Sequence, residues 1–130
     1  MTVRRPDILI VEGLNVLQPC RCPGGRDPAV ARTDLFDLTL YVDAEPDDLR
    51  RWYVARLQAL LRVAHGNLPP HLRRYASLSA GEIAEQATRR YREINEVNLI
   101  ENIQLTRERA DVIVRKGSDH AVREVLVRTR

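Results

Sequence analysis

An uninterrupted apolar run near the start of the chain constrains the fold more than any other feature. Residues 8–11 read Ile-Leu-Ile-Val and are followed by Glu12 and Gly13. Strands of a parallel sheet are covered on both faces, so they form continuous apolar runs rather than alternating patterns. The run therefore predicts a buried strand over residues 7–12 of an α/β protein.

The rest of the chain alternates strands with helices. Pro46, followed by Asp47 and Asp48, predicts a helix start, and Ser79 with Glu82 matches a capping box at a second one. The expected elements after the first strand are a strand at 35–43, helices at 46–64 and 79–103, and strands at 111–115 and 121–128. This order predicts an α/β fold, mainly a parallel sheet with flanking helices.

Composition limits the class of protein. The 130 residues suit one domain, which we expect to span residues 1–130. Apolar residues make up 44% and charged residues 30%, as in a globular rather than a disordered protein. No apolar run approaches the roughly 18 residues of a membrane span, and the run at 8–11 is too short for a signal peptide. We therefore expect a cytoplasmic protein with no membrane partner.

Charge argues against a nucleic-acid partner. The 21 Lys and Arg residues against 18 Asp and Glu residues leave a net charge of +3. The arginines are scattered among acids, and no basic stripe alternates with aromatic residues. The small positive excess fits an anionic ligand such as a phosphate.

Cys20 and Cys22 are the only cysteines. They lie in residues 18–33, a segment rich in proline and glycine that we expect to be an exposed loop. No second Cys or His pair stands at zinc spacing, so we interpret them as two free thiols.

Glu12 is the first candidate for a functional residue. A carboxylate at the end of an apolar strand, followed by glycine, is the arrangement in which P-loop kinases hold Mg²⁺ or its waters. The pattern also fits an ordinary acid at a strand end, which is the commoner case.

The expected helix 46–64 carries a second candidate pair, Tyr53 and Arg56. The apolar residues of this helix form one stripe at helical spacing, and Arg56 falls on it, four residues before Leu60. A buried arginine needs an anionic partner. That partner is either a structural carboxylate or a bound phosphate, and spacing alone does not decide between them.

Three asparagines share one face of the expected helix 79–103, namely Asn95, Asn98 and Asn102. Asparagine is a poor helix former, so three in one helix break a local rule. Amide side chains suit a polar, uncharged substrate, whereas the alternative is solvated asparagines near a frayed helix end.

Lys116 and His120 enclose a Gly-Ser-Asp turn between two expected strands. Turn residues at the edge of an α/β sheet often contact a nucleotide base, although an exposed loop with a chance histidine is the alternative. Ser118 in this turn has no activating neighbours and is not a credible nucleophile.

Six segments, in order, resemble the C-terminal half of bacterial prokaryotic-type pantothenate kinases. They are PDILIVEGLNVLQ, YVDA, WYVAR, RRYASLS, REINEVNLIENI and TRERADVIVRKGSDHAV, and they span nearly all of residues 6–128 apart from 18–33. The resemblance implies a partial P-loop kinase fold and the phosphorylation of pantothenate by ATP with Mg²⁺, the first step of coenzyme A biosynthesis. It also implies feedback inhibition by coenzyme A in competition with ATP.

The resemblance implies roles for individual residues in phosphoryl transfer and nucleotide binding. Glu12 would stand near the Mg²⁺ and the phosphates. Arg56 would neutralise charge on the transferred phosphoryl group, as a catalytic residue. Lys116 and His120 would lie near the adenine.

The resemblance also implies a substrate pocket. Tyr53, Tyr75 and Asn95 would line the pocket for pantothenate, with Asn95 binding its amide or hydroxyl. Leu60 stands where the family commonly has an aromatic residue beside the coenzyme A site, which puts that contact in doubt.

The largest departure from the family is an absence. No G-x-x-x-x-G-K-[ST] occurs in the 130 residues, so the phosphate-binding loop, with the strand and helix that carry it, is not in this sequence. We therefore expect the chain by itself to be inactive, with a loop-bearing N-terminal half or a second copy as its partner. Without that loop's strand, we expect strands at 8–11 and 111–114 to be short of a neighbour.

Two alternatives remain open. One is another kinase of the same superfamily, such as a relative of uridine kinase or phosphoribulokinase. The other is a non-catalytic remnant that binds a partner chain or coenzyme A.

Overall fold

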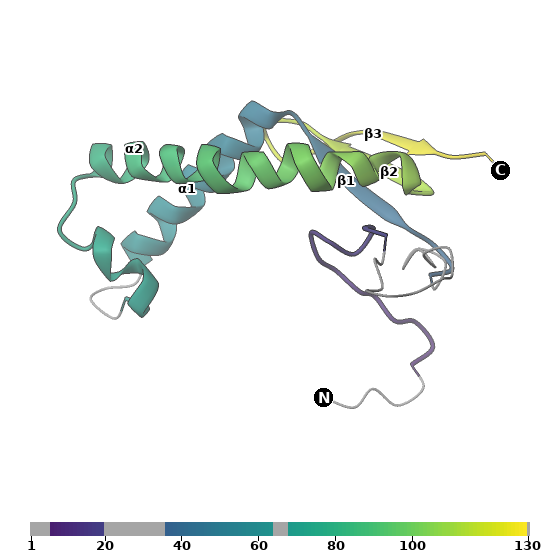
Figure 1. Cartoon of the computed structure of the whole chain (residues 1–130), viewed down its shortest axis with the longest axis horizontal. Helices are drawn as coiled ribbons and strands as arrows, with labels where there is room; N and C mark the ends of the chain where they lie inside the picture. The colour runs from purple at the N-terminus through teal and green to yellow at the C-terminus, as the bar shows by residue number, and fades with distance from the viewer. Residues whose placement is uncertain (1–5, 20–35, 64–67, 130) are drawn as a thin grey trace, which may run out of the picture.

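A three-stranded sheet and two crossing helices form the described part of the chain, which covers residues 6–19, 36–63 and 68–129 of this computed structural model (Figure 1). In chain order the elements are β1 (Leu40–Ala44), α1 (Pro46–Val63), η2 (Pro70–Tyr75), α2 (Ala80–Arg90), η3 (Tyr91–Glu96), η4 (Leu99–Ile103), η5 (Gln104–Arg109), β2 (Val112–Lys116) and β3 (Val122–Val127). The structure thus confirms an α/β architecture.

The sheet is mixed rather than mainly parallel. Its strands lie in the order β1-β2-β3, with β1 parallel to β2 and β2 antiparallel to β3. The long helical connection between β1 and β2 allows the parallel pairing. The N–H of Gly117 donates to the carbonyl of Ala121 across the tight turn between β2 and β3. A turn this short can only join antiparallel strands.

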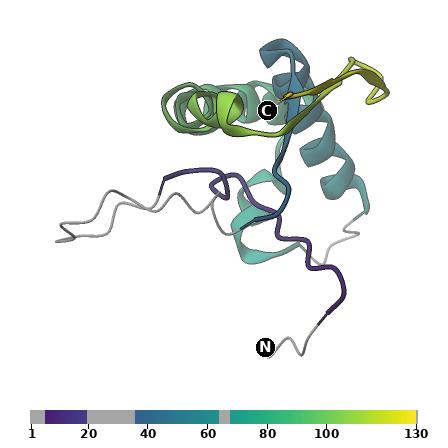
Figure 2. The ribbon, with the colours of Figure 1, turned by 90° about the vertical axis from the view of Figure 1, so that its right-hand side faces the viewer.

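The predicted strand at residues 7–12 is wrong for this structure. These residues have no strand assignment and are exposed, with Ile10 84% exposed. In both views the segment lies apart from the long helices (Figures 1 and 2). A strand is stable only when its N–H and C=O groups pair with a neighbour, and no described strand lies beside this one to pair with it.

The strand at 111–114, which we expected to be short of a neighbour, has a partner on both sides. The predicted strand 111–115 corresponds to β2, which pairs with β1 on one side and β3 on the other. The two free edges of the described sheet belong to β1 and β3 instead.

The helix starts follow the local sequence signals. Ser79 accepts a hydrogen bond from the Glu82 N–H, and the Glu82 carboxylate accepts one from the Ser79 N–H at 2.8 Å, so the capping box is confirmed. The helical stretch passes its expected end at Ile103 and continues as η5 to Arg109, and the α-helix α2 itself ends at Arg90. Beyond that residue it widens into two π-helical segments, η3 and η4.

The core of the described residues consists of two small clusters. Leu17, Tyr41 and Ala110 form one beside the sheet, and Leu57, Tyr75 and Ala87 form the other between the helices. No large side chain among the described residues is fully buried. Much of the apolar surface that a sheet and its helices would normally cover is therefore open.

Candidate functional site

Helix α1 directs two neighbouring aromatic side chains to different parts of the molecule. Tyr53 packs toward the helix cluster around Leu57, while Trp52 contacts the turn between β2 and β3. Successive helical residues lie about 100° apart, which is why one helix serves both places. The residues predicted for substrate and for nucleotide therefore gather at two locations along α1.

The first location is a tyrosine cluster. Tyr75 at the end of η2 is buried against Leu57 and Ala87, and Tyr53 packs against the same group. The ring of Tyr53 also lies 5.5 Å from that of Tyr91, tilted by 52°. The structure thus brings together two of the three residues predicted for the substrate pocket, Tyr53 and Tyr75.

Tyr91 is a member of this cluster that the sequence analysis missed. It is buried, and burial raises the pKa of its hydroxyl, with the negative charge of Glu96 adding to the increase and Arg50 opposing it. The spacing in the sequence could have identified Tyr91, because it precedes Asn95 by four residues and so shares the same helix face.

The asparagine face coincides with the π-helical segments. Asn95 is half-buried in η3, and the amide of Asn102 in η4 donates to the Asn98 side chain at 3.0 Å. The expected sharing of one face is confirmed for Asn98 and Asn102 by this bond. A π-helical turn is rare and is frequently found at functional sites, so this stretch is a candidate for substrate recognition.

The second location is a stacked pair at the β2–β3 turn. The rings of Trp52 and His120 are 4.1 Å apart at 26°, and Trp52 Nε1 donates to the carbonyl of Ser118 at 3.0 Å. Lys116 Nζ lies 5.3 Å from the centre of the indole ring, within cation–π range. Both residues predicted for the nucleotide, Lys116 and His120, therefore meet at one aromatic side chain.

The turn itself holds an unusual backbone. His120 has φ of +66°, a left-handed conformation that is uncommon for a residue with a side chain. Asp119 braces the turn by accepting from the Ala121 N–H at 3.1 Å and from Arg123 at 2.8 Å. The bond from Ala121 and the charge of Arg123 lower the pKa of the Asp119 carboxyl.

Arg56 does not occupy the position that the sequence predicted. It is exposed, although its helical neighbours Tyr53 and Leu57 pack inward. The apolar stripe is narrower than expected, because Leu60 is also largely exposed. Because Arg56 is exposed, it needs no anionic partner for its stability. The catalytic role of Arg56 therefore depends on the family resemblance alone.

Glu12 lies outside both locations. It is exposed and belongs to the segment without strand structure. Within residues 6–19, 36–63 and 68–129, no group of three or more His, Cys, Asp or Glu side chains could hold a metal ion. Cys20 and Cys22 lie outside the described residues.

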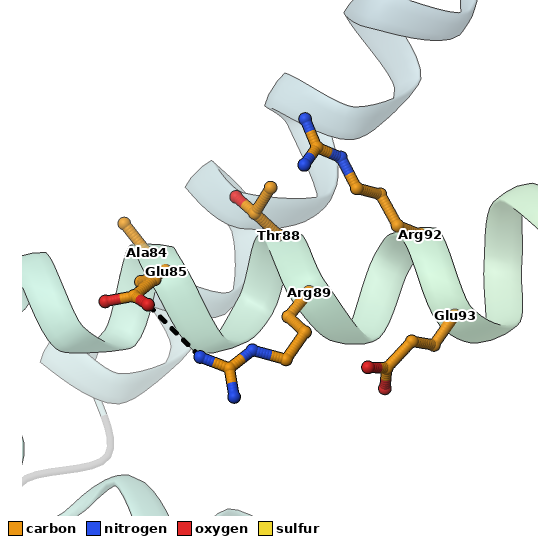
Figure 3. A pocket seen from close by; sticks show the side chains of 6 residues that line it. All are labelled: Ala84, Glu85, Thr88, Arg89, Arg92 and Glu93. Atoms are coloured by element: carbon orange, nitrogen blue, oxygen red, sulfur yellow. Dashed lines mark hydrogen bonds and ion pairs between the residues drawn. The ribbon is translucent and has the colours of Figure 1, made fainter.

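An open hollow of about 590 Å³ lies along α2 and η3 (Figure 3). Its lining residues are Ala84, Glu85, Thr88, Arg89, Arg92 and Glu93. Figure 3 shows Arg89 reaching back to Glu85, with which it forms an ion pair at 3.1 Å. None of the residues predicted from the sequence lines this hollow, and its charged groups are exposed.

No helix in the described ranges is long and apolar enough to cross a membrane. α1 reaches 18 residues, but it carries charged residues at both ends.

Comparison with known proteins gives consistent matches to one family. The chain is 50% identical over 130 residues to a pantothenate kinase of Streptomyces avermitilis, 45% over 123 residues to one of Parvibaculum lavamentivorans and 48% over 129 residues to one of Brevibacillus brevis. These alignments include 95–98% of this chain but only 38–40% of each relative. No protein-family model matches the chain.

Proposed function

Because this chain corresponds along 98% of its length to the C-terminal part of pantothenate kinases, we propose that it supplies the pantothenate and adenine contacts of such an ATP-dependent kinase. The 50% identity to the Streptomyces avermitilis enzyme is the observation that carries the proposal. The P-loop kinase fold, a cytoplasmic location, and inhibition by coenzyme A are parts of the same proposal. The described α/β sheet and helices fit such a fold in part.

The tyrosine cluster supports the substrate side of the proposal. Tyr53 and Tyr75 pack in one cluster, and Tyr91 connects it to the helix face of Asn95. We assign pantothenate to this region, where tyrosine hydroxyls and the asparagine amide can bind its hydroxyl, amide and carboxylate groups. The absence of a strong fixed charge among these residues suits recognition by hydrogen bonds.

The stacked pair supports the nucleotide side. The imidazole ring of His120 stacks on the indole of Trp52, with the ring centres 4.1 Å apart, and Lys116 lies over the same indole. A planar ring next to a cation suits an adenine with its phosphates, by stacking and by charge. The left-handed turn at His120 is a local cost that such a role would explain.

Arg56 is the proposed catalytic residue. Its exposed guanidinium on α1 lies three residues after Tyr53 and four after Trp52, between the two locations. A phosphoryl group passing from nucleotide to substrate must travel between these locations. Arg56 would there stabilise the negative charge that the reaction spreads over the transferred group.

ATP would supply the phosphoryl group, and Mg²⁺ would screen the charge of its phosphates. Glu12 is the residue of this chain assigned to the metal, but the described residues do not place it with other carboxylates. The 130 residues also contain no phosphate-binding loop. The proposal therefore assigns the phosphate and metal site mostly to a polypeptide with that loop, and homodimerisation of the complete enzyme remains part of the proposal.

A direct test uses the chain together with the part of the Streptomyces avermitilis enzyme that precedes the matched region. We expect the pair to phosphorylate pantothenate and to leave uridine and ribulose 5-phosphate unreacted. Asn95→Ala should raise the KM for pantothenate, while Asn102→Ala, on an exposed position, serves as the matched control. Phosphorylation of uridine in place of pantothenate would overturn the assignment.

The absent phosphate loop also favours a second candidate, a non-catalytic fragment that binds coenzyme A. Calorimetry separates the two. Tight binding of coenzyme A by a pair that shows no phosphorylation of pantothenate would support the second candidate over the first.

A further inference from the structure

Trp52 joins helix α1 to the β2–β3 turn by two different contacts. Its indole N–H donates to the carbonyl of Ser118 at 3.0 Å, and its ring stacks on that of His120 with the ring centres 4.1 Å apart. The side chain of Lys116 lies over the same indole, with Nζ 5.3 Å from the ring centre. One side chain of α1 therefore contacts both residues predicted for the nucleotide and the backbone between them.

The bonds inside the turn fix its backbone but not the ring of His120. The N–H of His120 donates to the carbonyl of Gly117 at 2.9 Å, and the N–H of Gly117 donates to the carbonyl of Ala121 at 2.9 Å. These bonds hold the left-handed backbone at His120. The two side-chain torsions of a histidine have several staggered or broad minima, which backbone bonds leave open. The stack on Trp52 restricts these torsions and so gives the imidazole one orientation.

The stack covers one face of the imidazole and leaves the other open. The two rings are inclined by 26°, so the indole lies flat against one side of the imidazole. Trp52 is half-buried, whereas His120 is exposed. A planar base can therefore stack on the open face of His120 without touching Trp52, which lies on the far side of the imidazole.

We propose that Trp52 is a positioning residue for the nucleotide, because it holds the imidazole of His120 in the orientation that stacks on the adenine base. This rests on the proposed function, which assigns ATP to this turn. A ring that is already restricted loses less conformational entropy when the base binds. Trp52 therefore acts on the affinity for ATP through His120, and it takes no part in the transfer of the phosphoryl group.

The test measures ATP binding by calorimetry, with the chain combined with the preceding part of the Streptomyces avermitilis enzyme. Trp52→Ala removes both contacts, whereas Trp52→Phe keeps a ring for the stack and loses only the N–H donor. We expect Trp52→Ala to weaken ATP binding roughly three- to tenfold, the effect of one side chain that is no longer held in place. Trp52→Phe should recover most of this loss. Arg62→Ala, at an exposed position of the same helix, is the control and should bind ATP like the wild type.

Steady-state kinetics separate positioning from a general loss of structure. Trp52→Ala should raise the KM for ATP by the same factor and leave kcat and the KM for pantothenate nearly unchanged. Nuclear magnetic resonance of the chain supplies a direct signature, because the ring current of an indole shifts the protons of a stacked imidazole upfield. This shift should persist in Trp52→Phe and disappear in Trp52→Ala, and the spectrum of His120→Ala identifies the signal.

Three results would contradict the positioning role. One is unchanged ATP binding in Trp52→Ala, and another is a Trp52→Phe variant that binds ATP as weakly as Trp52→Ala. The third is an equal rise in the KM for ATP and for pantothenate, because Trp52 would then support the structure as a whole. Trp52→Leu, which keeps apolar bulk without a ring, replaces Trp52→Ala if circular dichroism shows that Trp52→Ala is unfolded.

The positioning role and the proposed function fail separately, because calorimetry requires no turnover. A reconstituted enzyme that binds ATP with the expected dependence on Trp52, but does not phosphorylate pantothenate, retains the positioning role and rejects the proposed function. An enzyme that phosphorylates pantothenate and binds ATP equally well in all Trp52 variants does the reverse.

Discussion

Thr39 and Asp111 bind each other at the point where β1 and β2 begin, across 72 residues of sequence. The Asp111 carboxylate accepts from the Thr39 N–H at 2.9 Å and from the Thr39 hydroxyl at 2.7 Å, and the hydroxyl accepts from the Asp111 N–H at 3.0 Å. Thr39 is buried. This reciprocal pair lies at the start of the parallel pairing of β1 with β2, and β2 leads into the turn that carries His120.

Thr39→Val should destabilise the chain by about 1–3 kcal/mol, because at nearly constant volume it removes the two hydrogen bonds of the hydroxyl, one of them to the charged Asp111 carboxylate, and leaves only the backbone bonds between the two residues. Urea denaturation, on the chain or on its complex, measures the loss. Thr39→Ser retains the hydroxyl and should lose much less. Equal stability of all three proteins would show that this pair does not hold the strands.

The 130-residue chain alone should not phosphorylate pantothenate, because it has no phosphate-binding loop. A coupled assay with ATP, Mg²⁺ and pantothenate measures the rate. Addition of the preceding segment of the Streptomyces avermitilis enzyme should restore activity. Turnover by the chain alone within tenfold of an intact relative would contradict the prediction.

Arg56→Ala in the reconstituted enzyme should lower kcat by roughly 10²–10³ and change the KM for pantothenate little. The reason is that the positive charge of Arg56 would stabilise the transition state of phosphoryl transfer more than it stabilises bound pantothenate. Steady-state kinetics provide both constants. Arg62→Ala is the matched control, since Arg62 is an exposed arginine of the same helix. A variant with normal kcat and a lower melting temperature would make Arg56 structural.

His120→Ala should move the fluorescence emission of Trp52 to longer wavelength, because it exposes an indole face that His120 now covers. Trp52 is the only tryptophan of the chain, so the signal is unambiguous. The variant should also weaken ATP binding to the reconstituted enzyme. His71→Ala, at a distant exposed histidine, should do neither.

The capping box at α2 predicts a pH dependence. Hydrogen bonds from the Ser79 hydroxyl and N–H lower the pKa of the Glu82 carboxyl. A lowered pKa in the folded state stabilises the chain at neutral pH, and this contribution disappears as the pH falls below about 4. The difference in melting temperature between wild type and Glu82→Gln should therefore shrink on acidification.

Ser79→Ala provides the control for that experiment. It removes the first cause of the shift and should cost about 1 kcal/mol of helix stability. In this background, Glu82→Gln should have a smaller effect at every pH. A difference between wild type and Glu82→Gln that does not change with pH would contradict the role of the ionised carboxylate.

Local signals in the sequence were enough for most of the elements. Pro46, the Ser79 capping box and the apolar runs at β2 and β3 act through neighbouring residues, and the structure places the bounds of α1, β2 and β3 and the start of α2 within one residue of the prediction. β1 begins at Leu40, five residues after its predicted start at 35. The same local spacing indicated the Asn98–Asn102 contact. The family resemblance likewise required only the order of the segments.

Packing between distant segments decided the rest. Residues 8–11 have a strand sequence but no strand structure, because a strand needs a neighbour that the described residues do not supply. Arg56 lies on the apolar stripe in sequence yet is exposed, because only part of α1 meets another helix. Trp52 fits a core stripe in sequence but stacks on His120, since the β2–β3 turn, 66 residues further along, folds back against it. Periodicity determines which residues share a face, whereas the tertiary structure determines what that face meets.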